Sequence, residues 1–169
     1  MSPLSGVRVL DMSRLLPGPF CTQLLCDLGA EVIKVEDPEG GDYARSYPPL
    51  LGDGNSAAFH ALNRGKLSVT LDLKRAEDWR RFLALVATAD VLVESFRPGV
   101  LAKLGAGPSA LAARFPGLIV CSISGYGQTG PDALRAGHDV NYLAKSGVLG
   151  LMARPELLPV QVADIAGGR

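Results

Sequence analysis

Short apolar runs alternate with amphipathic or polar stretches along most of this chain. The runs are nearly continuous in Val, Ile and Leu, which is typical of strands covered on both faces. Five of them predict strands: Gly6–Ser13 (GVRVLDMS), Glu31–Glu36 (EVIKVE), Leu67–Leu73 (LSVTLDL), Asp90–Ser95 (DVLVES) and Leu118–Ser124 (LIVCSIS).

Segments with helical features separate these runs. Pro17–Gly29 has prolines near its start and a glycine at its end, the usual punctuation of a helix. Gly99–Pro116 predicts one or two short helices. Within Ala76–Ala89, large apolar side chains recur at helical spacing: Trp79, Phe82, Leu83 and Val86. Strands that alternate with helices form βαβ units, so we predict an α/β fold, a Rossmann-like parallel sheet with helices on both faces.

Two features of this pattern locate a site. The stretch from Asp37 to Lys66 is rich in Gly, Pro and polar residues and predicts a long loop, which is usually functional or mobile. In a parallel sheet the ligand lies beyond the carboxyl ends of the strands. The loops of interest therefore start at Ser13, Glu36, Leu73, Ser95 and Ser124.

Gly125–Gly130 (GYGQTG) matches the G-x-G-x-x-G pattern of dinucleotide-binding turns. Its context argues against NAD. It follows the fifth predicted strand rather than the first, and Asp132–Ala136 is too short for the helix that holds the pyrophosphate. No acidic strand end stands about 20 residues further on. We interpret the glycines as a loop where backbone approaches a ligand closely, and a nicotinamide-linked oxidoreductase is not expected.

The composition narrows the class of protein. The 169 residues contain 17 basic and 17 acidic ones, and this zero net charge argues against nucleic acid or a membrane surface as partner. No apolar run approaches the length of a membrane span, and the N-terminus does not resemble a secretory signal. Cys21, Cys26 and Cys121 form no disulfide framework. We therefore expect a cytoplasmic protein whose cysteines are small core residues.

Candidate chemistry follows the glycine loop. His138 lies in GHDVNYLAKSG, and Asp164 is predicted at the end of a strand, before Gly167 and Gly168. A histidine and a carboxylate on opposite sides of one carbon can move a proton on and off it. A carboxylate beside a glycine-rich turn can instead attack a carbonyl and form an anhydride. The alternative is that each residue only caps a helix, and the residues alone leave all three interpretations open.

Several segments together resemble the family III CoA-transferases, the CaiB/BaiF family that also contains α-methylacyl-CoA racemase. The resemblance covers essentially the whole chain. It is carried by PLSGVRVLDMSRLLPGPFCTQLLCDLGAEVIKVEDPEGGD, NRGKLSVTLDLK, ADVLVESFRPGVLAKLGAGP, LIVCSISGYGQTGP, GHDVNYLAKSG and VADIAGG.

This resemblance implies two possible reactions. The Asp of the AD-x-x-G-G segment, Asp164 here, is the nucleophile of the transferases. In the racemases it is an acid/base paired with the His of GHD-x-NY, His138 here. Transferases usually carry an aromatic residue at that histidine position, so His138 favours the racemases, whereas the long stretch Gly40–Lys66 looks like the transferases. We expect racemisation of 2-methylacyl-CoA thioesters first, with CoA transfer through an Asp164 acyl anhydride as the alternative. An inactive CoA-binding fragment is a further alternative.

The resemblance also implies how the thioester is held. Coenzyme A enters as part of the substrate; no permanently bound cofactor and no metal are expected. Lys74 and Arg97 are candidate phosphate partners, or else only exposed cations. The family often has an Arg where Asp37 stands, and Arg14, Lys34 and Arg45 are candidate substitutes. The implied substrate-binding and CoA-binding residues are Leu71, Asp72, Leu73, Lys74, Ser95, Phe96, Arg97, Gly137, Asp139, Val140, Asn141 and Tyr142.

Members of this family are considerably longer and form interlocked homodimers. Residues 1–169 are therefore expected to be the N-terminal large domain of the fold, truncated before the smaller domain and the returning segment. The acyl group and the acceptor acid cannot be named from these residues.

Overall fold

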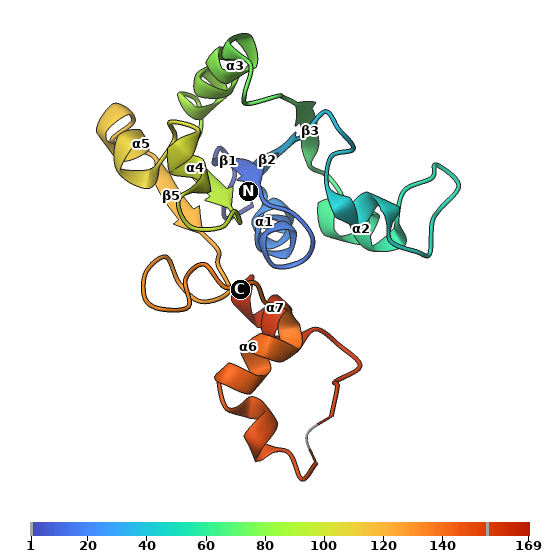
Figure 1. The fold of residues 1–169 in the computed structure, drawn as a ribbon. Coiled ribbons are helices and arrows are strands. Elements are labelled where there is room, and N and C mark those ends of the chain that lie inside the picture. Colours follow the sequence, from blue (N-terminus) through green and yellow to red (C-terminus); the bar gives the residue numbers. More distant parts are fainter. Residues whose placement is uncertain (1, 155) are drawn as a thin grey trace.

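A computed structural model describes residues 2–154 and 156–169 of the chain. Five parallel strands form one sheet in the order β3-β2-β1-β4-β5 (Figure 1). The strands are β1 (Arg8–Met12), β2 (Glu31–Glu36), β3 (Leu67–Thr70), β4 (Val91–Glu94) and β5 (Ile119–Ser122). The predicted parallel α/β sheet is confirmed.

The β2 strand has its predicted bounds, but the other four strands are shorter than predicted. Beyond the ends of β3 and β4, side chains bind the backbone of the loops that follow. After β4, the Glu94 carboxylate accepts a hydrogen bond from the backbone N of Phe96 at 2.8 Å. After β3, Asp72 accepts one from the backbone N of Lys74 at 3.0 Å. Such local bonds compete with the sheet ladder and end the strand.

Helices cover both faces of the sheet, as predicted (Figure 1). They are α1 (Pro17–Asp27) on one face and α3 (Ala76–Val86), α4 (Val100–Lys103) and α5 (Pro108–Arg114) on the other. Alternation along β1 decides which core each residue joins: Val9 packs towards α1, whereas Leu10 packs against Phe82 of α3. Both strand residues have no exposed surface, because strands of a doubly covered sheet bury both faces.

The segment predicted as one long loop contains two short helices. The 3₁₀-helix η1 spans Tyr43–Ser46, and the helix α2 spans Ala57–Asn63. The α2 helix begins at Ser56, whose hydroxyl accepts a hydrogen bond from the backbone N of Ala58 at 3.1 Å. A seven-residue helix with polar flanks has too few turns to show a clear apolar period, which is why the sequence pattern missed it.

A buried ionic cluster fixes the carboxyl end of β1. Asp11, which has no exposed surface, accepts hydrogen bonds from Lys66 Nζ at 3.1 Å and from Thr22 Oγ1 at 2.6 Å. Burial by itself would raise the pKa of Asp11, but Lys34, Lys66 and two hydroxyls outweigh it and hold this pKa below its ordinary value of 3.8. The ionised carboxylate therefore stabilises the fold above pH 3.8, and this contribution is lost as the pH falls through the lowered pKa.

Lys66→Met is expected to lower the free energy of unfolding by about 3 kcal/mol, because it leaves the buried Asp11 carboxylate short of a partner. Urea unfolding at neutral pH measures the loss. The double variant Asp11→Asn/Lys66→Met removes both charges and should be more stable than Lys66→Met alone. A single variant as stable as the wild type would contradict this account of the cluster.

In the C-terminal part of the described chain, residues 139–151 extend away from the sheet, whereas residues 162–167 return to lie beside α1 (Figure 1). This part contains α6 (Asp139–Lys145), the 3₁₀-helix η2 (Val148–Leu151) and α7 (Val162–Gly167). The prediction that Asp164 lies at a strand end is wrong, because Asp164 is in the first turn of α7. No helix within the described ranges is long and apolar enough to cross a membrane.

Candidate active site

The topology places a cavity at the point where the strand order reverses. The chain leaves β1 towards β2 on one side and returns to β4 on the other side of β1. The loops that follow β1 and β4 therefore diverge and leave a crevice beyond the carboxyl ends of the strands. A cavity of about 740 Å³ lies there, between the loop at Arg14, the turn at Ser95 and the segment around His138.

The structure brings together seven of the predicted site residues in this cavity, which is lined by Ser95, Phe96, Arg97, Gly137, His138, Tyr142 and Asp164 among others. They come from the turn after β4, from α6 and the backbone before it, and from α7. The seven other predicted residues lie outside its lining: Leu71, Asp72, Leu73, Lys74, Asp139, Val140 and Asn141.

Asp139 lies outside the lining but holds α7 in place. Its Oδ1 accepts hydrogen bonds from the backbone N of Ala163 at 2.7 Å and from that of Asp164 at 3.0 Å. A carboxylate that caps the first backbone N–H groups of a helix stabilises both the helix and its position. This cap from α6 explains why the segment at Asp164 forms a helix rather than a strand.

His138 and Asp164 face the same cavity from two helices. His138 occupies the N-cap position of α6, where its backbone N donates to Asn141 Oδ1 at 2.9 Å, and its side chain is exposed. The Asp164 side chain is partly buried and accepts a hydrogen bond from Gln161 Nε2 at 3.1 Å. Burial raises the pKa of Asp164 above 3.8, the Asp139 charge raises it further, and His138 opposes both.

The helix-capping interpretation holds in part. The interpretation that His138 caps a helix agrees with its N-cap position at α6. Asp164 is the third residue of α7 and does not cap this helix, since Gln161 holds the N-cap position. A partly buried carboxyl group that caps no helix end and lines a cavity is available for chemistry.

Two glycines of the loop after β5 let a tyrosine pack closely. A Cβ on Gly125 would lie 2.4 Å from the Tyr142 ring, and one on Gly137 would lie 2.7 Å from the Tyr126 hydroxyl. Tyr142 donates its hydroxyl hydrogen to the Gly137 carbonyl at 2.8 Å. Gly125 of the G-x-G-x-x-G segment therefore serves close packing at the cavity wall.

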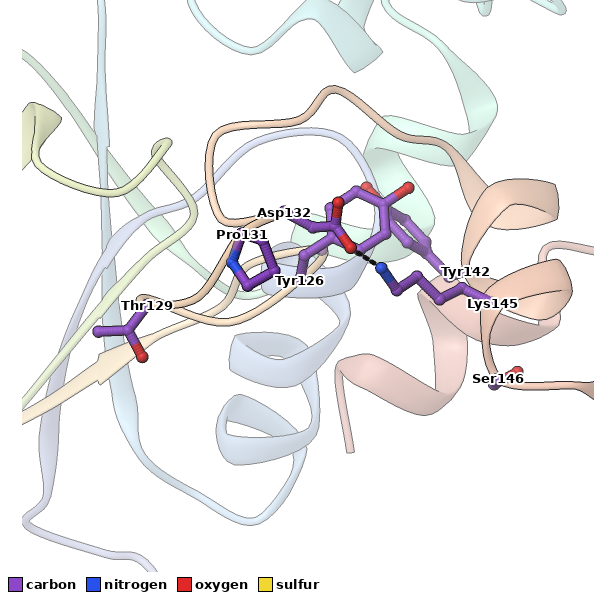
Figure 2. A pocket seen from close by; sticks show the side chains of 8 residues that line it. Tyr126, Thr129, Pro131, Asp132, Tyr142, Lys145 and Ser146 are labelled. Atoms are coloured by element: carbon purple, nitrogen blue, oxygen red, sulfur yellow. Dashed lines mark ion pairs between the residues drawn. The ribbon is translucent and has the colours of Figure 1, made fainter.

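A second cavity of about 560 Å³ adjoins this wall. Figure 2 shows Lys145 paired with Asp132 across it. The Nζ of Lys145 also lies 5.5 Å from the Tyr126 ring centroid. Gly125 and Tyr142 line both cavities. Asp132–Ala136, which the sequence showed to be too short for a pyrophosphate-binding helix, forms no helix in the described structure, where α6 begins at Asp139.

Close packing also joins α7 to α1. A Cβ on Gly168 would lie 2.3 Å from the carbonyl oxygen of Pro17, which itself lines the main cavity. Gly168→Ala is therefore expected to push α7 off α1 and to lower the free energy of unfolding by about 1–3 kcal/mol. Gly167→Ala is the matched control, because a Cβ there meets nothing within 4 Å. Urea unfolding compares the two; equal stability would show that α7 is not packed as described.

Arg14, Lys34 and Arg45 were considered in place of the arginine that the family often has at position 37. Two of these three cations are already bound to carboxylates of the protein. Lys34 is only 2% exposed, and its Nζ lies 2.9 Å from Asp42 Oδ2. Arg45 donates its Nε hydrogen to Glu36 Oε1 at 2.9 Å, and this pairing helps hold the pKa of Glu36 at about 2 against the effect of burial. Both cations are therefore already paired with carboxylates of the protein, which does not favour either of them as a phosphate partner. Arg14 remains, since it lines the cavity.

The comparisons with known proteins agree with this geometry. The family model of CoA-transferase family III matches residues 4–169. The chain belongs to CoA-transferase family III. Its relatives include the succinate–glutarate CoA-transferase of Agrobacterium fabrum, which is 47% identical over 98% of this chain and 44% of its own length. The acetyl-CoA:oxalate CoA-transferase of Acetobacter aceti is 44% identical over 98% of this chain and 44% of its own length.

Solved structures show the same fold. A crystal structure of a CaiB/BaiF family protein from Brucella suis is 44% identical over 99% of this chain, with a TM-score of 0.93. The match covers 46% of the Brucella chain. The resemblance noted in the sequence is thus confirmed at the level of the family, and the chain spans less than half the length of these family III relatives.

Proposed function

We propose that this family III protein transfers coenzyme A between an acyl-CoA thioester and a carboxylic acid, with Asp164 as the nucleophile. The observation that carries the proposal is the place of Asp164, a partly buried carboxyl group on the cavity at the sheet's switch point. The relatives support transfer over racemisation, because the two at 44% and 47% identity are named CoA-transferases. We therefore place CoA transfer first and racemisation second, the reverse of the order expected from the sequence.

The steps can be written from the chemistry of the carboxylate. An Asp164 oxygen attacks the thioester carbonyl, the C–S bond breaks, and coenzyme A leaves as a thiolate, so that a mixed anhydride remains on Asp164. The thiolate then attacks the Asp164 carbonyl of the anhydride and releases the donor acid, which leaves an aspartyl-CoA thioester. The reverse of both steps with an acceptor acid forms the new thioester and restores Asp164.

The chain's own residues position this nucleophile. Gln161 holds one Asp164 oxygen by a hydrogen bond of 3.1 Å, and Asp139 fixes the start of α7. The other Asp164 oxygen is then left for attack. Holding a reacting group in one orientation contributes to the rate by removing the entropy cost of alignment.

A second candidate function is exchange of the proton α to the thioester carbonyl. The specific observation that favours it is the position of His138, which lines the same cavity as Asp164. The two side chains also interact, because a charge on His138 lowers the pKa of Asp164. A neutral imidazole would take the proton from one face, and a protonated Asp164 would return one on the other.

We also propose the substrates, the oligomeric state and the cellular location of the protein. An acyl-CoA thioester and a carboxylic acid are the partners, and coenzyme A is a substrate rather than a resident cofactor. We propose a homodimer by the family resemblance and a cytoplasmic location, where the free thiols of Cys21, Cys26 and Cys121 stay reduced.

Trapping the intermediate tests the proposal. The protein is incubated with an acyl-CoA and hydroxylamine, which converts an aspartyl thioester or anhydride into a hydroxamate, and the peptides are mapped by mass spectrometry. We expect a hydroxamate on Asp164 only when the thioester is present. Thioester turnover that leaves Asp164 unmodified would overturn the covalent mechanism.

A further inference from the structure

The proposed transfer leaves His138 without a task. The acceptor acid attacks as an ionised carboxylate and coenzyme A attacks as a thiolate, so neither nucleophile needs a base. We propose that His138 activates water against acylated Asp164, so that the protein also hydrolyses acyl-CoA thioesters when no acceptor acid is bound. This inference rests on the proposed CoA transfer and adds a second reaction at the same site.

Once Asp164 is acylated, His138 is the one base left in the cavity lining that the structure describes. The other titratable residues of this lining are arginines and tyrosines: Arg14, Tyr43, Tyr47, Arg97, Arg135 and Tyr142. At neutral pH arginine stays protonated and tyrosine keeps its hydroxyl hydrogen, whereas an imidazole can accept a proton. Water is a nucleophile that must lose a proton as it attacks, and only His138 among these side chains can take it.

The start of α6 places His138 beside Asp164. The residue that follows it, Asp139, accepts hydrogen bonds from the backbone N of Ala163 at 2.7 Å and from that of Asp164 at 3.0 Å. This contact joins the first turn of α6 to the first turn of α7. The backbone N of His138 is fixed in turn by Asn141 Oδ1 at 2.9 Å. A charge on His138 is close enough to lower the pKa of Asp164.

Solvent reaches this base. The His138 side chain is exposed, whereas the Asp164 side chain is partly buried. A site that forms a reactive acyl intermediate protects it by excluding water. An exposed histidine at the same cavity works in the opposite direction, because it can deprotonate a water molecule that enters beside the intermediate.

Hydrolysis starts from the aspartyl-CoA thioester, which persists after the donor acid has left until an acceptor arrives. His138 takes a proton from water, and the water oxygen bonds to the side-chain carbonyl carbon of Asp164. The C–S bond breaks, and coenzyme A leaves as a thiolate that takes up the proton from His138. Asp164 regains its carboxyl group and loses a proton to solvent. Over the whole cycle, thioester and water become a carboxylate, free coenzyme A and a proton.

The first test measures the release of coenzyme A from butyryl-CoA and from glutaryl-CoA with no acid added. We expect release by the wild type to exceed hydrolysis in buffer. The rate should fall by about 10²- to 10⁴-fold in His138→Phe, the usual contribution of a general base, and should be lost in Asp164→Asn. His60→Phe is the matched control, because His60 is an exposed histidine of α2 outside the lining of the cavity.

The destination of the water oxygen tests the step itself. Turnover in water labelled with oxygen-18 should put the label into Asp164, because water attacks the carbonyl carbon of this residue. Peptide mass spectrometry detects the label, and the peptide that contains Asp139 should stay unlabelled. Label in the released acid with none in Asp164 would overturn the proposal, because water would then attack the acyl group.

Transfer assays keep this inference separate from the proposed function. The same proteins and thioesters are given a mixture of acetate and succinate, and new thioesters are measured. Transfer without hydrolysis, or hydrolysis that is equal in His138→Phe and the wild type, would overturn the inference and leave CoA transfer standing. Hydrolysis that requires both His138 and Asp164, without any transfer, would support the inference and contradict the proposed function. Absence of both reactions would contradict both.

Discussion

Asp164→Asn is expected to abolish CoA transfer, with kcat lower by about 10³-fold or more. The amide has nearly the same shape and can keep a contact with Gln161, so the fold should persist, but it cannot form an anhydride with an acyl group. Steady-state transfer assays measure the loss. Asp53→Asn, which changes an exposed carboxylate in the loop before α2, is the matched control.

The ionisation of Asp164 gives this prediction a pH dependence. A carboxylate must be ionised to attack, and burial followed by the Asp139 charge raises the pKa of Asp164 above 3.8. The rate should therefore fall on the acid side at a pH above 3.8, before the protein unfolds, as circular dichroism can verify. Transfer by Asp164→Asn at more than about a tenth of the wild-type rate would contradict its role as nucleophile.

His138→Phe is expected to separate the two candidate reactions. Any exchange of the α-hydrogen should fall by about 10²- to 10⁴-fold, the usual contribution of a general base. Transfer should fall much less, because Asp164 carries out the covalent step. Exchange is measured by deuterium incorporation and transfer by the appearance of the new thioester. If both rates fell by the same factor, His138 would belong to the transfer mechanism as well.

The sheet and its helices were predictable because their signals are strong and local. Continuous apolar runs mark the strands, and β2 has its predicted bounds, Glu31–Glu36. The shorter β3 and β4 could not be foreseen to the residue, because side-chain bonds such as that of Glu94 to Phe96 N decide where a ladder ends. The capping of α7 by Asp139, 25 residues earlier than Asp164, is a tertiary contact that no local pattern contains.

The candidate site was predicted in the same uneven way. His138 and Asp164 were candidates from their sequence context, the resemblance suggested their roles, and the structure places both on one cavity. The roles of Arg14, Lys34 and Arg45 could not be separated by sequence, since all three are cations near the position of Asp37 and the sequence does not show their partners. Burial and partners separate them: Lys34 and Arg45 are bound to buried carboxylates, and Arg14 faces the cavity. Asp11 and Lys66 drew no attention, because a buried ion pair has no sequence signature.

One mass-spectrometric experiment tests the central claim most directly. The protein is incubated in D₂O with a 2-methylacyl-CoA and a dicarboxylic acid, and every thioester formed is weighed. We predict a new thioester of the added acid, without deuterium at the α-carbon of the donor, and its loss in Asp164→Asn. Deuterium at the α-carbon with no new thioester would contradict CoA transfer and establish proton exchange by His138 and Asp164 in its place.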